Sequence, residues 1–278
     1  MAHCAGQLSI HKRASMNRLI LCCLLLVLGF SATWVRAEDA ALAKLFSARA
    51  VQGTLVLANR DGSRSYVHNE ARAAQPLLPA STFKIPNTLI ALDEGVITEK
   101  ELLKWDSTDK GLAAWNRDQT LASAFKNSCV WCYQELAQRI GAKRYQAWLK
   151  KIDYGNALPG PELTTFWLSG DLRISAQQQI TFLKKLYRRE LPFKAASYDA
   201  LRRIMLAEEK PGYRLYAKTG WAGYGEKDTP QTGWYVGYLE TGTDVWFFAL
   251  NMAITKPAEA AYRQQMVLEA LKLKGIIE

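Results

Sequence analysis

Residues 233–252 read GWYVGYLETGTDVWFFALNM, and this stretch decides the fold class. Two runs rich in aromatic and β-branched residues flank Thr241-Gly242, which is typical of two strands joined by a short turn. A third strand is predicted just upstream, where residues 214–217 read Arg-Leu-Tyr-Ala. Because no helical pattern separates these strands, we expect them to pair antiparallel.

The remaining elements can be placed around this sheet. Residues 53–58 and 65–67 are β-rich and flank an Asp-Gly turn, which predicts an N-terminal hairpin. From about 81 to 186 the pattern is mostly helical, clearest over 122–140 and 175–186, and a loop is expected at 155–170. A further helix follows residue 192, and 258–273 is a closing amphipathic helix. The sequence predicts an α+β fold: an antiparallel β-sheet flanked by helices, with an inserted all-helical subdomain.

The first 37 residues have the order of a secretory signal peptide. Basic residues at 12, 13 and 18 precede an apolar run over 19–30, and small residues end at Ala37. The apolar run is shorter than the roughly 20 residues that span a bilayer. We expect cleavage after Ala37 to release a single domain, 38–278, that is exported to the periplasm without a membrane attachment. Met16 is an alternative start.

Composition and charge exclude several classes of protein. The 278 residues are 49% apolar and 22% charged, which suits a sizeable core and excludes collagen-like, disordered and disulfide-scaffold chains. Cleavage would remove four basic residues and no acidic one, so the net charge falls from +10 to +6. No dense Lys/Arg tract is left, and no nucleic-acid partner is expected.

Histidine is scarce in the part expected to remain after cleavage. Only His68 is left, and its neighbours suggest an exposed strand or turn residue. A multi-histidine zinc site is therefore excluded, and no metal is predicted. If the protein uses a nucleophile, its base is expected not to be an imidazole.

Three short motifs carry potential chemistry. Residues 81–84 read Ser-Thr-Phe-Lys, and Ser81 and Lys84 would share one face of a helix, with Ser81 at its N-terminus. A neutral lysine, or a group derived from it, could then activate the serine as a nucleophile. Lys218-Thr-Gly ends a predicted strand, where it could present a cation and a hydroxyl along a cleft. Taken singly, each motif is also compatible with a solvated lysine beside a cap or turn.

The third motif and the order of all three are more specific. Ser128-Cys-Val opens a helical stretch 47 residues after Ser81, and Lys218 follows a further 90 residues on. This order strongly resembles that of the penicillin-recognising serine enzymes. Ser128-Cys-Val stands where class A β-lactamases have Ser-Asp-Asn, and the chain instead resembles a class D, oxacillinase-type β-lactamase. Supporting matches cover essentially the whole mature chain, at residues 79–86, 154–156, 167–175, 218–221, 233–237 and 247–251.

The resemblance implies a serine β-lactamase/D,D-peptidase-like fold and an acyl-enzyme mechanism. Ser81 would open the β-lactam amide, and Lys84 would be N-carboxylated by carbon dioxide, supplied as bicarbonate, to become the general base. Ser128, assisted by Lys218, would pass a proton to the leaving nitrogen. No other bound cofactor is implied.

The resemblance also assigns supporting roles. The backbone N–H groups of Ser81 and Trp221 would form the oxyanion hole. The substrate carboxylate would be bound by Arg263 and by Thr219, which precedes Gly220 in the strand-end motif. Val130 and Trp167 would enclose Lys84, Trp167 donating a hydrogen bond to the carbamate, and 154–156 would support the site loop. The loop at 221–232 shapes substrate range in this family.

Cys129 and Cys132 form a C-x-x-C pair that the function does not need. Because the pair lies within a helical pattern rather than at a helix N-terminus, a buried pair of thiols is favoured over a redox couple. A local disulfide stays open, since bridging positions i and i+3 of a helix is geometrically demanding.

The sequence leaves other functions to be weighed. A penicillin-binding sensor domain and a D,D-peptidase share the motifs, and a thiol oxidoreductase is the least favoured alternative. The antibiotics cleaved, including carbapenems, and the choice between monomer and homodimer are left open.

Overall fold

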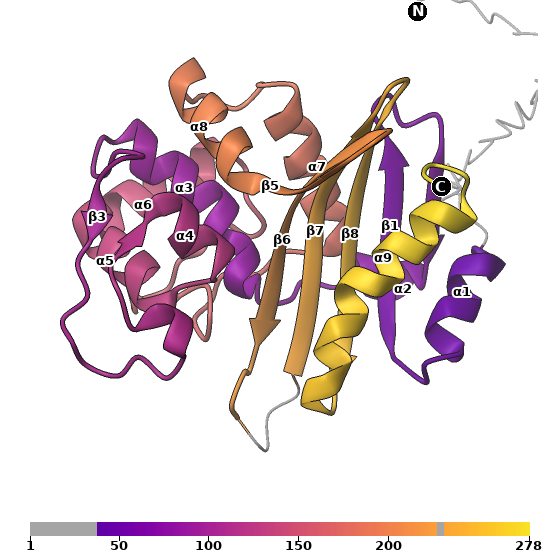
Figure 1. The fold of residues 1–278 in the computed structure, drawn as a ribbon, viewed down its shortest axis with the longest axis horizontal. Coiled ribbons are helices and arrows are strands. Elements are labelled where there is room, and N and C mark those ends of the chain that lie inside the picture. Colours follow the sequence, from indigo (N-terminus) through magenta and orange to yellow (C-terminus); the bar gives the residue numbers. More distant parts are fainter. Residues whose placement is uncertain (1–37, 227–230) are drawn as a thin grey trace, which may run out of the picture. The chain divides into compact units, whose positions relative to one another are not determined.

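A six-stranded antiparallel sheet forms the centre of the chain in a computed structural model that describes residues 38–226 and 231–278 (Figure 1). Its strand order is β2-β1-β8-β7-β6-β5. The strands are β1 Gly53–Asn59, β2 Ser65–His68, β5 Leu206–Lys210, β6 Tyr213–Ala222, β7 Gln231–Thr241 and β8 Val245–Ile254. The signal-peptide prediction for 1–37 lies outside the described residues.

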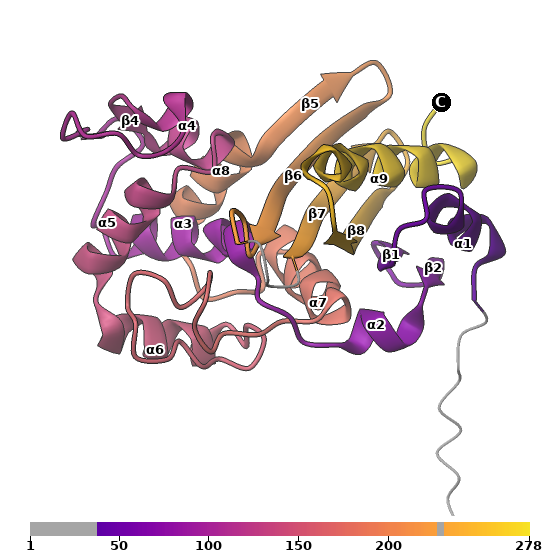
Figure 2. The same cartoon turned by 90° about the horizontal axis from the view of Figure 1, so that it is seen from below.

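Helices cover both faces of the sheet (Figure 2). The helices α1 (Ala40–Ser47) and α9 (Tyr262–Leu273) lie on one face, with a 3-10 turn at Pro257–Ala261 before α9. The other face meets α2 (Glu70–Ala74) and α7 (Ala176–Tyr187). No helix among the described residues is long and apolar enough to cross a membrane.

The inserted helical subdomain lies between β2 and β5 in the sequence. It contains α3 (Lys84–Asp93), α4 (Leu121–Lys126), α5 (Val130–Ile140), α6 (Ala142–Lys151) and α8 (Ala195–Met205). A small hairpin, β3 (Leu102–Leu103) and β4 (Gln119–Thr120), and a 3-10 turn at Ala113–Trp115 complete it.

The alternation of strand side chains divides the core in two. In β8, Phe247 and Ala249 face the helical subdomain, whereas Phe248 and Leu250 face α9. Because both faces are covered, nearly every residue of β8 is buried. This explains why the strand is a continuous apolar run rather than an alternating one.

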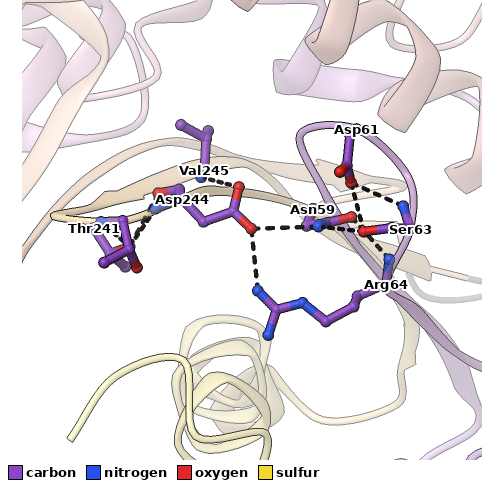
Figure 3. A network of polar contacts seen from close by, with 8 residues as sticks. Asn59, Asp61, Ser63, Arg64, Thr241, Asp244 and Val245 are labelled. Carbon is purple, nitrogen blue, oxygen red and sulfur yellow. Dashed lines mark hydrogen bonds and ion pairs between the residues drawn. The ribbon is translucent and has the colours of Figure 1, made fainter.

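Side chains fasten the N-terminal hairpin to the turn between β7 and β8 (Figure 3). The Asp244 carboxylate accepts hydrogen bonds from Arg64 (3.1 Å) and from Asn59 (3.3 Å). Within the hairpin turn, Asp61 accepts from the backbone and hydroxyl of Ser63. Two turns distant in sequence are thereby joined at one end of the sheet.

The predicted fold class is confirmed, with corrections to single elements. The predicted hairpin, three C-terminal strands and loop are present, and so are the predicted helices, except that the one expected over 122–140 is divided into α4 and α5. The edge strand β5 and the β3–β4 hairpin were not predicted. His68 is half-buried rather than exposed, because its ring packs against Phe46 and its Nδ1 contacts Glu38.

Candidate active site

A short 3-10 turn, Ala80–Phe83, leads directly into α3 and brings Ser81 and Lys84 together. Lys84 Nζ donates to Ser81 Oγ at 3.1 Å. Lys84 is 1% exposed and Ser81 8% exposed, so the pair is largely shielded from water. The prediction that Ser81 begins the helix is wrong in detail: it lies inside the 3-10 turn, and its side chain caps no helix.

Lys84 is buried against an aromatic ring rather than beside an acid. Its Nζ lies 4.8 Å from the ring centroid of Tyr133, and Ser81 Oγ is its only hydrogen-bond partner among the described residues. Burial lowers the pKa of Lys84 to about 7, because an unpaired ammonium is poorly solvated there. At neutral pH a large fraction of this amine is therefore uncharged.

Two residues of this environment were missed in the sequence. Thr88 Oγ1 donates to the carbonyl of Lys84 at 2.7 Å and lies 2.6 Å from the hydroxyl of Tyr133. Burial raises the pKa of Tyr133, so its phenol stays neutral. The sequence could have indicated Tyr133, because it lies one helical turn after Val130, which was already predicted to enclose Lys84.

Aromatic rings pack around Phe83, the residue that precedes Lys84 in the chain. Phe83 stacks on Trp167 at 5.7 Å between centroids and meets the edge of Phe166 at 5.1 Å. Trp167 is fully buried, and its Nε1 has no acceptor within the part of the chain that the structure describes. A buried donor without a partner is costly, so this N–H is available to a hydrogen-bond acceptor. The predicted support loop is held by Asn156, which donates to Asp171 O and accepts from Arg173 N.

The segment between α4 and α5 carries Ser128. The sequence predicted one helix over 122–140, but the chain breaks at residues 127–129, where Ser128 has a left-handed φ of 53°. The break turns the Ser128 hydroxyl toward β6, where it accepts a hydrogen bond from Lys218 Nζ. Val130 begins α5 and lines the pocket described below.

Lys218 of β6 is a second buried lysine. Its Nζ also lies 3.1 Å from Thr219 O and 3.2 Å from Thr219 Oγ1. Burial, and then the positive charges of Lys84 and Arg263, hold the pKa of Lys218 well below its ordinary value. Lys218 therefore holds its proton less tightly than an exposed lysine does.

Two glycines allow the strand ends to approach their neighbours. A Cβ at Gly220 would lie 3.1 Å from Pro79 O, so β6 can pack directly against the turn that carries Ser81. A Cβ at Gly233 would lie 2.7 Å from Arg263 Cδ. Gly233 therefore leaves room for the stem of Arg263.

Arg263 reaches the site from α9. Its Nη1 donates to Gly220 O at 2.6 Å and its Nε to Ala260 O at 2.7 Å. The guanidinium carbon lies 5.3 Å from the ring centroid of Trp221, and burial lowers the pKa of Arg263 to about 10. Arg263 still carries its charge at neutral pH.

These groups surround one pocket of about 430 Å³. Seven of the ten residues expected at the site line it: Ser81, Ser128, Val130, Thr219, Gly220, Trp221 and Arg263. Lys84, Lys218 and Trp167 lie buried behind this surface. The rest of the lining combines apolar side chains (Leu112, Trp115, Leu168 and Tyr224) with polar ones (Asn127, Thr165, Ser169 and Glu226). A few convergent polar groups within apolar walls are typical of a small-molecule site.

The expectation of a pair of thiols is wrong. Cys129 and Cys132 form a disulfide, with Cα atoms 5.5 Å apart. The pair lies at the N-terminus of α5, because Cys129 occupies the capping position and its Sγ accepts from the N–H of Cys132. The assumption of an unbroken helix caused the error.

Comparisons with known proteins agree with this geometry. A family model described as "Penicillin binding protein transpeptidase domain" matches residues 52–272. Beta-lactamase OXA-48 of Klebsiella pneumoniae is 42% identical over 233 residues, covering 84% of this chain and 87% of its own. Beta-lactamase OXA-20 of Pseudomonas aeruginosa is 40% identical over 237 residues, covering 84% and 86%.

Solved structures give the same result. The class D β-lactamase YbXI from Nostoc superposes with a TM-score of 0.81 at 42% identity, over 84% of this chain and 98% of that one. FUS-1 (OXA-85), a class D β-lactamase from Fusobacterium nucleatum subsp. polymorphum, gives 0.83 at 34% identity, over 87% and 100%. Since fold, family model and close relatives agree, this chain belongs to the class D β-lactamases, which are serine hydrolases.

Proposed function

We propose that the protein hydrolyses penicillins and related β-lactams through an acyl-enzyme on Ser81, with carboxylated Lys84 as the general base, and so confers antibiotic resistance. The observation that carries this proposal is the Ser81–Lys84 pair: a nucleophile 3.1 Å from a buried amine that faces no carboxylate among the described residues. An amine with a pKa near 7 is available in its neutral form to react with carbon dioxide.

The surroundings of Lys84 fit a carbamate. The Nε1–H of Trp167, which has no acceptor among the described residues, would supply a hydrogen-bond donor. Lys218 lies near enough to Lys84 for their charges to interact, and a negative charge at Lys84 would favour the charged form of Lys218. When bound, the carboxyl group supplies an anionic oxygen base. Burial disfavours the ammonium form of Lys84, which cannot be carboxylated, and the preceding residue, Phe83, packs against Phe166 and Trp167.

The other residues have roles in bond breaking. Ser81 Oγ attacks the lactam carbonyl and gives its proton to the base at Lys84. The carbon–nitrogen bond then breaks, and Ser128 gives the nitrogen a proton that Lys218 replaces. The contact between Lys218 Nζ and Ser128 Oγ supports this relay. Backbone N–H groups of Ser81 and Trp221 would stabilise the oxyanion. Water then hydrolyses the ester and frees Ser81.

Substrate binding would depend on charge at one end of the pocket. Thr219 and Arg263 line the pocket, and Arg263 is cationic and held by two backbone carbonyls. A fixed guanidinium can bind the β-lactam carboxylate with charge-assisted hydrogen bonds. The free enzyme would be exported to the periplasm after cleavage behind Ala37, as a monomer or homodimer.

Counting turnovers tests the proposal against a penicillin-binding sensor or a D,D-peptidase. We expect many turnovers of a chromogenic cephalosporin per enzyme molecule, with a transient acyl adduct seen by intact-mass spectrometry. A single stoichiometric burst, followed by a stable adduct, would instead indicate a sensor or penicillin-binding protein.

A further inference from the structure

The disulfide lies directly beside the residue proposed to transfer the proton. Cys129 follows Ser128 in the chain, and Cys132 lies one helical turn into α5. Both cysteines are fully buried. Ser128 has a left-handed φ, which is unfavourable for a residue with a Cβ, so its conformation needs support from its surroundings.

The segment enclosed by the disulfide also supports the pocket. Val130 lines it, and Trp131 Nε1 donates to the carbonyl of Trp115 at 3.0 Å. Trp115 Nε1 in turn donates to the carbonyl of Asn127, the residue before Ser128, at 2.9 Å. Together, the disulfide and these two hydrogen bonds hold the chain on both sides of Ser128, at residue 127 and at residues 129–132.

The size of the crosslinked loop argues for a local effect. The disulfide encloses residues 129–132 alone, and stabilisation through the unfolded chain grows with loop length. A four-residue loop contributes less of this stabilisation than a long one. Its effect should be concentrated on the geometry of the helix start and of Ser128.

We infer that the Cys129–Cys132 disulfide is a positioning crosslink that holds Ser128 in place for proton transfer to the leaving nitrogen. The inference rests on the proposed role of Ser128. The crosslink acts through Ser128 and does not contact the substrate itself. An enzyme with the dithiol in place of the disulfide should fold and bind β-lactams but turn them over slowly.

A double-mutant cycle tests the inference. The C129S/C132S variant removes the crosslink, but the hydroxyl at position 129 can still accept a hydrogen bond from the N–H groups at the start of α5. The C129A/C132A variant removes the crosslink and this acceptor together, and it is the matched apolar control. Relative to wild type, and normalised to titrated active sites, both should lose about ten- to a hundredfold in kcat, with KM changed much less. In an S128A background, removing the disulfide should cost nothing further.

The unmutated chain provides a second measurement that does not depend on how the variants fold. Full-length protein refolded with reductant gives the dithiol form, which is two hydrogens heavier by mass spectrometry. Oxidised glutathione then accepts two electrons and two protons as the disulfide forms. We expect kcat to recover on oxidation, while the melting temperature changes little.

Three results would overturn the inference, and they can be told apart. Equal kcat for dithiol and disulfide forms, or equal additional losses in the S128A and wild-type backgrounds, would show that the crosslink does not act through Ser128. If S128A itself kept wild-type kcat, the proposed relay would fail together with the inference.

Discussion

Replacing Trp167 by phenylalanine should weaken carboxylation of Lys84 without disturbing the fold. The substitution removes the Nε1–H, which has no acceptor in the structure, but keeps an aromatic ring against Phe83. A hydrogen bond to a charged group contributes about 1.5–3 kcal/mol. This corresponds to a roughly 10- to 150-fold higher bicarbonate concentration for half-maximal activity.

The stability of the same variant provides an internal check. Without carbon dioxide, removing an unsatisfied buried donor should gain about 1–3 kcal/mol, while the smaller ring should cost roughly 1–2 kcal/mol through its cavity. These effects nearly cancel, so the melting temperature in carbon-dioxide-free buffer should change little. Wild type should become more stable when bicarbonate is added, and W167F should lose this additional stabilisation.

The assay is a bicarbonate titration of kcat at pH 7.5, starting from degassed enzyme, with carbon-13 NMR to detect the carbamate. W167A serves as a comparison that removes the ring as well as the donor. The same half-saturating bicarbonate for W167F and wild type would refute a role of Trp167 as donor. Full activity of wild type without carbon dioxide would refute the carbamate itself.

Four further predictions concern separate parts of the molecule. S81A should form no covalent penicillin adduct by intact-mass spectrometry yet melt within a few degrees of wild type, because the hydroxyl caps no helix; an adduct would place the nucleophile elsewhere. R263A should raise KM for penicillins more than it lowers kcat, and an unchanged KM would contradict carboxylate binding by Arg263. In carbon-dioxide-free buffer the free energy of unfolding should rise from pH 7 to 10, and in bicarbonate-containing buffer kcat should fall below pH 7. The reason is that the unfolded chain holds the Lys84 proton up to its ordinary pKa of 10.5 and the folded protein releases it at about 7. Chemical denaturation of K84M should show a smaller rise, since only the part due to the buried Lys218 is left. D244A should lose about 1 kcal/mol of stability, measured by urea unfolding, with unchanged kcat/KM, since its contacts to Arg64 and Asn59 lie in turns outside the pocket.

The sequence was sufficient to locate most of the site, because its motifs are short and local. Ser81 and Lys84 are three residues apart, and a single helical turn fixes their distance. The break at Ser128 could not be predicted, since apolar residues keep a helical spacing on both sides and no Gly or Pro marks it. The left-handed φ there is set by tertiary contacts, including the bond to Lys218 from a strand 90 residues away.

Two other features could not be predicted from the sequence, because they too depend on contacts between distant parts of the chain. The edge strand β5 reads Leu-Ala-Glu-Glu-Lys, which has no strand-like pattern, and it forms only because β6 offers a partner. The position of Tyr133 over Lys84 depends on how α5 packs against α3. Such contacts follow from the assembled fold rather than from local preference.

The position of β1 has a consequence for the order in which the molecule can fold. β1 is the first strand of the chain, but it pairs with β8, the last, so that partners such as Gly53 and Met252 are about 200 residues apart. The N-terminal hairpin therefore cannot join the sheet until the last strand has been synthesised. A nascent chain that ends before residue 245 would leave edges of both β1 and β7 unpaired. Folding should therefore begin in the helical subdomain and finish when β8 completes the sheet.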